Sequence, residues 1–318
     1  MKSQIVLALA IASMGINSAL YAKAFKLADT QTSIELKSQP KKIAVYDLSI
    51  LDTLNALKIK AQLVPETTYF GSLASYQHNQ TLKAGTLFEP KLDVLKKAQP
   101  DLILIGGRSA KHLETLSQIA PTLNLSPNTT HYIDDLKART LSLAKAFDRE
   151  KIATQKLAEV DQLLNTLHAK TQGQSALMLF AAGENFMPHA ANDRFGYVHE
   201  LSGWRSVLPL TDKSVSTPRA EAGSPEALAQ AQKNLELLKS AVDQNPDYII
   251  VLDRGAVNTQ KYTAQDKIEK HEILSQAEAV KNRKVIYVNA DAWYLTGAGL
   301  DNTIFMLKEL LQKIDKQA

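Results

Sequence analysis

The sequence reads PDLILIGGR at residues 100–108 and PDYIIVLDR at residues 246–254. Each copy has a Pro-Asp pair, an apolar run and an arginine eight residues after the proline. A continuous apolar run of this length is typical of a strand that is buried on both faces of a parallel sheet. The arginine then follows the carboxyl end of the strand, where open α/β sheets place ligand groups. The pair predicts two similar lobes that share a cleft, although buried parallel strands also resemble one another without any duplication.

The composition agrees with a chain of two domains. Its 318 residues are 45% hydrophobic, which is sufficient for two cores. The 37 basic and 33 acidic residues nearly balance, and no face carries a dense run of Lys and Arg. We therefore expect no nucleic-acid partner, and any positive charge that matters to function should be local to a cleft.

Residues 1–24 have the pattern of a cleavable signal peptide. Lys2 gives a positive start, an apolar stretch covers residues 5–16, and Ala22-Lys23-Ala24 offers small residues for cleavage after Ala24 or Ala22. The chain contains no cysteine, which excludes disulfides, thiolate metal ligands and a lipid-modified cysteine. These features predict export to the bacterial periplasm.

Strand and helix patterns alternate along the rest of the chain, which predicts an α/β fold with mostly parallel sheets. Residues 25–147 form the first predicted lobe and residues 173–318 the second. Between them, residues 148–172 predict one linking helix, roughly 34 Å long at 1.5 Å per residue. Its apolar stripe has spacings of 4, 3, 4 and 3 and consists of Ala153, Leu157, Val160, Leu164 and Leu167.

Motifs of enzymes are absent from the sequence. It has no G-x-G-x-x-G, P-loop or G-x-S-x-G, and its seven histidines show no zinc-binding spacing. A binding protein is therefore favoured, and an exported α/β enzyme is the alternative from another class.

Three arginines follow predicted strands of the two lobes: Arg108, Arg194 and Arg254. Guanidinium stays charged and binds anionic oxygens with a planar fork of donors. One such ion pair at about 5 Å is worth roughly 3 kcal/mol at an effective dielectric constant near 20. Three converging arginines would suit a multiply anionic ligand. Near the end of the chain, Tyr294 is flanked by Trp293 and by glycines, and a phenolate can bind ferric iron.

The chain resembles the periplasmic ferric-siderophore-binding proteins of ABC importers, especially those for catecholate siderophores. The resemblance covers the whole mature chain and is carried by four segments in order: GGRSAK at 106–111, RFG at 194–196, NPDYI at 245–249 with Asp253-Arg254, and WYL at 293–295. It implies the class III periplasmic-binding-protein fold, in which two Rossmann-like lobes are joined by a single long helix.

The resemblance also implies a ligand site and partners. Arg108, Arg194 and Arg254 would surround the ferric complex, with Trp293 and Lys111 nearby and Tyr294 as a candidate ferric ligand. Where some relatives have a histidine ligand, this chain has STPRAE at 216–221, so either the siderophore saturates iron alone or Arg219 adds charge. The implied partner is an inner-membrane ABC permease, the protein would be a monomer, and no intrinsic cofactor is expected. Haem or cobalamin is the alternative cargo.

The two repeated segments differ just before their arginines. Gly106-Gly107 leaves backbone room beside Arg108, whereas Asp253 puts a carboxylate next to Arg254, which it could orient or partly neutralise. The sequence therefore predicts that Arg108→Ala weakens anion binding more than Arg254→Ala.

Overall fold

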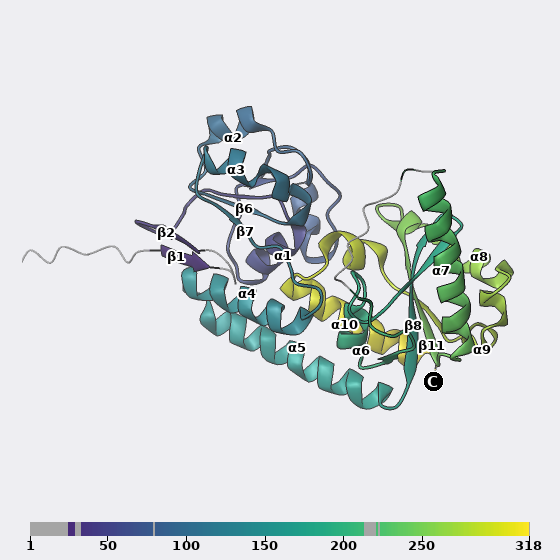
Figure 1. The fold of residues 1–318 in the computed structure, drawn as a ribbon. Helices are drawn as coiled ribbons and strands as arrows, with labels where there is room; N and C mark the ends of the chain where they lie inside the picture. The colour runs from purple at the N-terminus through teal and green to yellow at the C-terminus, as the bar shows by residue number, and fades with distance from the viewer. Residues whose placement is uncertain (1–24, 29–32, 79, 213–220, 222, 318) are drawn as a thin grey trace, which may run out of the picture.

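Two separate sheets, one early and one late in the chain, are connected by a long helix (Figure 1). A computed structural model describes residues 25–28, 33–78, 80–212, 221 and 223–317. Within these ranges, no helix combines the length and the apolar character needed to cross a membrane. The predicted signal peptide and Arg219 lie outside the described residues.

The N-terminal lobe contains a five-stranded parallel sheet in the order β5-β4-β3-β6-β7. Its strands are β3 (Ile43–Val45), β4 (Leu63–Val64), β5 (Leu82–Lys83), β6 (Leu102–Ile105) and β7 (Thr122–Asn124). Its helices are α1 (Leu48–Ala56), η1 (Gly71–Gln77), α2 (Leu92–Ala98), η2 (Gly107–His112) and α3 (Leu113–Ser117). An antiparallel pair, β1 (Phe25–Ala28) and β2 (Ser33–Leu36), precedes the sheet.

The C-terminal lobe contains a parallel sheet in the order β10-β8-β11-β12, and β9 pairs antiparallel with β8. Its strands are β8 (Ser175–Ala182), β9 (Asn185–His189), β10 (Arg205–Ser206), β11 (Tyr248–Asp253) and β12 (Val285–Tyr287). Its helices are α6 (Tyr197–Ser202), α7 (Pro225–Asp243), η3 (Arg254–Ala256), α8 (Ala264–Lys270), η4 (Leu274–Gln276), α9 (Glu278–Lys281) and the π-helix η5 (Asp291–Thr296).

The two repeated segments are β6 and β11, and the prediction that both are buried parallel strands is confirmed. β6 lies between β3 and β7, and β11 lies between β8 and β12. Every residue of both strands is buried. The chain leaves each of these strands at the carboxyl edge of its sheet.

Helix α5 (Glu150–Thr171) connects the lobes and runs along one side of both (Figure 1). Its 22 residues correspond to a length of about 33 Å, and all five residues of the predicted apolar stripe are buried. It packs against α4 (Tyr132–Ala146), α6 and α10 (Leu300–Asp315). Three ion pairs tie α5 to α10: Lys156–Asp301, Lys308–Glu159 and Lys170–Asp315.

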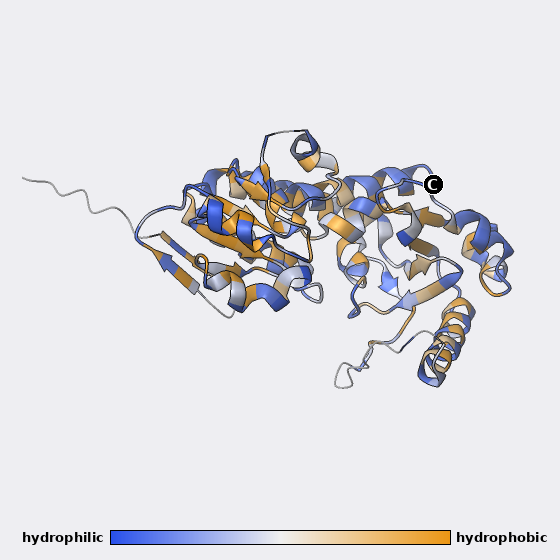
Figure 2. Ribbon diagram, turned by 90° about the horizontal axis from the view of Figure 1, so that it is seen from above, coloured by the Kyte–Doolittle hydropathy of each residue, from blue (hydrophilic) through white to orange (hydrophobic). Residues whose placement is uncertain are grey.

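One apolar core passes continuously through both lobes. It joins side chains of α1, α4, α5 and α10 to one face of the C-terminal sheet, while two smaller cores fill the outer sides of the sheets. Figure 2 shows this distribution, with hydrophobic strands inside each lobe and hydrophilic residues on the outward helices. Because close-packed cores resist deformation, we expect small movements of the lobes rather than wide opening.

Candidate ligand-binding site between the lobes

A cavity of about 270 Å³ lies where the carboxyl edges of the two sheets face each other. Its N-terminal wall comes from the β3–α1 turn, η2, the segment after β7 and the start of α4. Its C-terminal wall comes from the 194–197 loop and from η5 with the turn that follows it. The lining residues are Asp47, Ser49, Gly107, Arg108, Ser126, Pro127, Thr129, Tyr132, Arg194, Phe195, Tyr197, Trp293, Tyr294, Leu295, Thr296, Gly297 and Ala298.

The π-helix η5 carries two aromatic residues of the C-terminal wall, Trp293 and Tyr294. Gly297 donates its N–H to Ala292 O, five residues back, and this bond closes the wide turn. Gly297 itself has φ +60° and ψ −131°, a conformation that side-chain-bearing residues rarely adopt. Single π-helical turns are rare and occur often at functional sites. Here the turn places Tyr294 in the cavity wall.

Tyr294 is the centre of the site. Its ring stacks on Phe180 at 5.8 Å between centroids, and Phe195 lies 6.2 Å away. The guanidinium carbon of Arg194 lies 5.3 Å from the ring centroid. Arg254 lies close enough to the phenol to lower its pKa. The structure therefore brings groups from three separate chain segments to one phenol.

The electrostatic surroundings favour the ionised form of Tyr294. Burial alone raises the pKa of its phenol, because a phenolate loses hydration. The nearby Arg254 and the charges of Arg194 and Arg108 outweigh that effect, so the pKa of Tyr294 lies below the ordinary value of a phenol. This direction is notable because burial raises the pKa of several other tyrosines, including Tyr46 and Tyr197.

Arg194 lies in a tight loop built by its own neighbours. Asp193 accepts a hydrogen bond from Ala190 N at 2.9 Å, and Gly196 N donates to Asp193 O at 2.9 Å. A Cβ on Gly196 would come within 2.2 Å of Ala190 O, so this loop requires glycine there. The loop holds Arg194 over the Phe195 ring at 4.9 Å while leaving its side chain exposed. Its guanidinium is available to an anionic ligand.

Arg254 begins η3, directly after β11. The buried carboxylate of Asp253 accepts backbone hydrogen bonds from Gly255, Thr263 and Ala264. Asp253 therefore fixes the loop that carries the arginine. The pairing of Asp253 with the Arg254 guanidinium, suggested by the sequence, is not among the described ion pairs.

Arg108 makes a different set of contacts. It is half-buried, and its guanidinium donates to Tyr294 O at 2.7 Å and to Leu295 O at 3.1 Å. These bonds connect the N-terminal lobe to the carbonyl end of η5. Arg108 thus lines the cavity and also links the two lobes, with its guanidinium 6.0 Å from the Tyr294 ring centroid.

Of two further residues that the sequence predicted for the site, Trp293 lines the cavity and Lys111 does not. Trp293 is almost fully buried: its indole stacks on Tyr197 at 5.5 Å and donates to Glu309 at 2.9 Å, so it forms the floor of the cavity. Lys111 does not line the cavity; its ammonium pairs with Glu89 at the surface.

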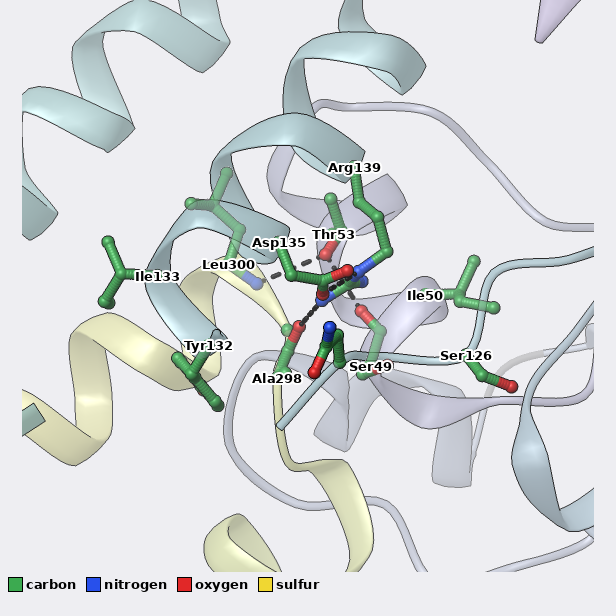
Figure 3. A network of polar contacts seen from close by, with 12 residues as sticks. Ser49, Ile50, Thr53, Ser126, Tyr132, Ile133, Asp135, Arg139, Ala298 and Leu300 are labelled. Carbon is green, nitrogen blue, oxygen red and sulfur yellow. Dashed lines mark hydrogen bonds and ion pairs between the residues drawn. The ribbon is translucent and has the colours of Figure 1, made fainter. Parts of the chain in front are cut away.

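A polar network fixes the lobes beneath the cavity (Figure 3). Arg139 of α4 donates to Asp135 at 2.7 Å and to Ala298 O at 2.9 Å, and Leu300 N donates to the Thr53 hydroxyl at 3.3 Å. Next to it, the fully buried Asp52 accepts a hydrogen bond from Asn302 N at the start of α10. Burial raises the pKa of Asp52 to about 6. The network joins α1 and α4 to the segment that follows η5.

Comparisons with known proteins agree with this architecture. The family model described as periplasmic binding protein matches residues 43–292. The chain belongs to this family. It is 27% identical over 286 residues to the petrobactin-binding protein YclQ of Bacillus subtilis (strain 168), covering 89% of this chain and 85% of that protein. It is 25% identical over 284 residues to the ferric-anguibactin-binding protein FatB of Vibrio anguillarum, covering 87% and 83%.

Solved structures give the same fold. The crystal structure of YclQ superposes with a TM-score of 0.76 at 24% identity, covering 92% of this chain and 99% of that one. The periplasmic catecholate-siderophore-binding protein VctP of Vibrio cholerae also gives 0.76, at 23% identity, covering 91% and 100%. The predicted class III periplasmic-binding-protein fold, with two α/β lobes and a linking helix, is confirmed, as is the resemblance to siderophore-binding proteins.

Several lining residues were not predicted. Asp47 follows β3 and caps α1, so its side chain also has a local structural role. Tyr197 lies in an apolar context that is typical of a core, as does Phe180, which stacks on Tyr294 without lining the cavity. The available signal for Asp47 was its place after a parallel strand, the same signal that identified Arg108 and Arg254.

Proposed function

We propose that this protein is a periplasmic binding protein that captures an anionic ferric siderophore, of catecholate or mixed catecholate type, in the interlobe cavity. It would deliver this cargo to an inner-membrane ABC permease for iron uptake. Membership of the periplasmic binding protein family supports a binding role rather than a catalytic one. The names of the relatives, petrobactin-binding and ferric-anguibactin-binding, support the cargo class.

One observation carries the proposal: a phenol of lowered pKa lies among three arginines at the cleft. Catecholate oxygens and phenolate are hard donors that suit ferric iron. The guanidinium groups of Arg194 and Arg254 would bind the negative charge of the chelate. Tyr294 would offer its oxygen to an iron site that the siderophore leaves open. A metal-ion receptor would need a cluster of His, Asp or Glu, and none that could hold a metal was found in the described ranges.

The remaining predicted ligand-binding residues have supporting roles in this proposal. Arg108 would hold the cleft closed over the cargo, and Trp293 would form the floor. Lys111 would add positive charge outside the cavity, and the contribution of Arg219, which lies outside the described residues, stays a prediction from the sequence. The cavity of about 270 Å³ is small for a complete siderophore complex, so part of the cargo would extend toward solvent or the Arg108 bonds would open on entry.

The proposed function also requires export of the chain and docking on the permease. Residues 1–24 would direct the chain to the periplasm and be removed, and the mature monomer would dock on the permease. N-terminal sequencing of protein from a periplasmic fraction tests this: Phe25 is the expected first residue, and an uncleaved cytoplasmic chain would contradict export.

The cargo is tested with the ferric complex of 2,3-dihydroxybenzoate. We expect binding to quench protein fluorescence, because Trp293 lies under the cavity, and to shift the visible charge-transfer band. Tyr294→Phe should bind the complex without that shift, since the phenol oxygen is gone. Haem and cobalamin serve as competing ligands. Tight binding of either of them, with no response to ferric catecholates, would refute the proposal.

A further inference from the structure

The two walls of the cavity differ in charge. The C-terminal wall presents Tyr294 and Arg194, whereas the N-terminal wall presents, in addition to Arg108, a carboxylate, Asp47, from the β3–α1 turn. Asp47 is 6% exposed and is the one acidic residue among the described lining residues. A wholly anionic ligand would place its negative oxygens against this carboxylate, which is unfavourable.

Helix capping uses only half of the Asp47 carboxylate. Its Oδ1 accepts hydrogen bonds from Ser49 N at 2.9 Å, from the Ser49 hydroxyl and from Ile50 N at 3.3 Å. Its Oδ2 accepts no hydrogen bond from any described residue, and Asp47 forms none of the ion pairs found in the described ranges. An ionised carboxylate has about four acceptor sites, so Oδ2 can accept hydrogen bonds from a ligand in the cavity.

The absence of a side chain at Gly106 leaves space for Oδ2. A Cβ on Gly106 would come within 2.1 Å of Oδ2, so only a glycine leaves the carboxylate where it is. The Gly106-Gly107 pair thus accommodates an acidic group in the cavity wall as well as leading into Arg108.

A second polar group in the cavity also has no partner. Thr296 is 3% exposed and lines the same cavity, and its hydroxyl makes no hydrogen bond. Ser49 and Ser126, drawn in Figure 3, add further hydroxyls to the N-terminal wall. Buried polar atoms normally have partners, so the cavity, with the Thr296 hydroxyl on its C-terminal wall, is suited to a ligand that makes hydrogen bonds.

We propose that the cargo is dipolar: its anionic, iron-chelating end faces Tyr294, Arg194 and Arg254, and an arm with a protonated nitrogen reaches Asp47. This inference rests on the proposed function, because it assumes a ferric chelate in the cavity. A protonated amine or imidazolium fits better than a neutral donor, since it also compensates the charge of the carboxylate.

The test uses two catechols that differ by one charge. Dopamine carries a protonated amine. 4-Ethylcatechol has the same catechol and the same two-carbon chain but lacks the amine. Ferric complexes of each, prepared under argon at pH 7, are titrated into the full mature protein by isothermal calorimetry. We expect the dopamine complex to bind on the order of tenfold more tightly.

Asp47→Asn removes the charge and keeps a good helix cap. It should abolish the preference, so that the two complexes bind within about twofold of each other. Asp93→Asn is the matched control, because Asp93 lies in the first turn of α2 in the same lobe and does not line the cavity. This variant should retain the tenfold preference. Thermal unfolding checks that both variants are folded.

The outcomes separate the two proposals. Equal binding of both complexes by the wild-type protein overturns the dipolar cargo and leaves the siderophore function standing. A preference that survives in Asp47→Asn also overturns it, since Asp47 would then be only a cap. If neither ferric complex binds, the proposed function fails and this inference fails with it.

Discussion

The two copies of the Pro-Asp strand place their arginines in different environments. Arg108, in the N-terminal lobe, is half-buried and donates to two carbonyls of the opposite lobe. Arg254, in the C-terminal lobe, is exposed and lies near the Tyr294 phenol, whose pKa it helps to lower. The first arginine connects the lobes, and the second helps to lower the pKa of Tyr294, for which we propose a role in binding iron. A repeated strand therefore does not imply a repeated role.

The residues before the arginines explain the difference. Gly106 lets the Asp47 carboxylate pack against the end of β6, and η2 then directs Arg108 across the cleft. Asp253 instead binds the backbone of its own loop and holds Arg254 close to β11. The sequence alone predicted that Arg108 matters more for anion binding. The geometry leads us to propose the opposite order.

The largest expected effect is on ligand binding by Arg254→Ala. Removing this positive charge from beside Tyr294 should weaken binding of a ferric catecholate about 100-fold, or about 2.7 kcal/mol. Arg108→Ala should weaken it only about fivefold, because its guanidinium is already engaged with carbonyls. Titrations of both variants, with the fold checked by circular dichroism, measure this order. A larger loss in Arg108→Ala would reverse the comparison.

The glycines near the two arginines, Gly106 and Gly255, should differ in how much their replacement by alanine lowers the free energy of unfolding. Gly106→Ala should destabilise the protein by about 2 kcal/mol, because its Cβ would overlap the Asp47 carboxylate. Gly255→Ala should cost less than about 1 kcal/mol, since its Cβ would lie 3.1 Å from Asp253 Oδ1 and a small shift relieves that contact. Urea unfolding compares them. Equal losses would show that the two turns are under the same constraint.

Arg108→Ala should also loosen the connection between the lobes. Two half-buried hydrogen bonds would be lost, which should lower the free energy of unfolding by about 1–2 kcal/mol. Arg254→Ala, whose side chain is exposed, should change it by less than about 0.5 kcal/mol. Small-angle scattering of the ligand-free variants adds a second readout, in which only Arg108→Ala should increase the radius of gyration. An unchanged free energy of unfolding in Arg108→Ala would contradict the role of Arg108 in linking the lobes.

The smallest effect is expected for Lys111→Ala. Its ammonium pairs with Glu89 at the surface, where both side chains are mostly exposed, and such pairs contribute little. We expect a change below about twofold in ligand affinity when ionic strength is held at 0.15 M. A tenfold loss of affinity would show that Lys111 contacts the ligand, as the sequence resemblance implied.

Much of the fold follows from patterns that the sequence makes visible. The apolar runs at 102–105 and 248–253 lie inside their sheets, and the stripe of Ala153, Leu157 and its partners is buried along α5. Such patterns are reliable because burial of a strand or a helix face requires them. Arg108 and Arg254 could be picked out for a similar reason, since they follow the carboxyl ends of parallel strands, whereas Arg194 follows the antiparallel strand β9.

Other features could not be predicted because they depend on contacts between distant segments. The antiparallel strand β9 contains Pro188 and lacks a clear alternation, so it does not read as a strand. The π-helix η5 contains Trp293 and Tyr294, which favour a strand when considered locally. The direction of Arg108 depends on carbonyls 186 residues away. The free oxygen of Asp47 depends on Gly106 in a neighbouring strand connection.

The central claim is that arginines, chiefly those of the C-terminal lobe, lower the pKa of Tyr294. It is tested most directly by the pH dependence of phenolate absorbance, taken as the difference between wild-type protein and Tyr294→Phe. We predict that this phenol ionises at a lower pH than free tyrosine, and that Arg254→Ala moves its titration to higher pH by more than Arg108→Ala does. Ionisation at or above the pH of free tyrosine, or a larger shift in Arg108→Ala, would contradict the account.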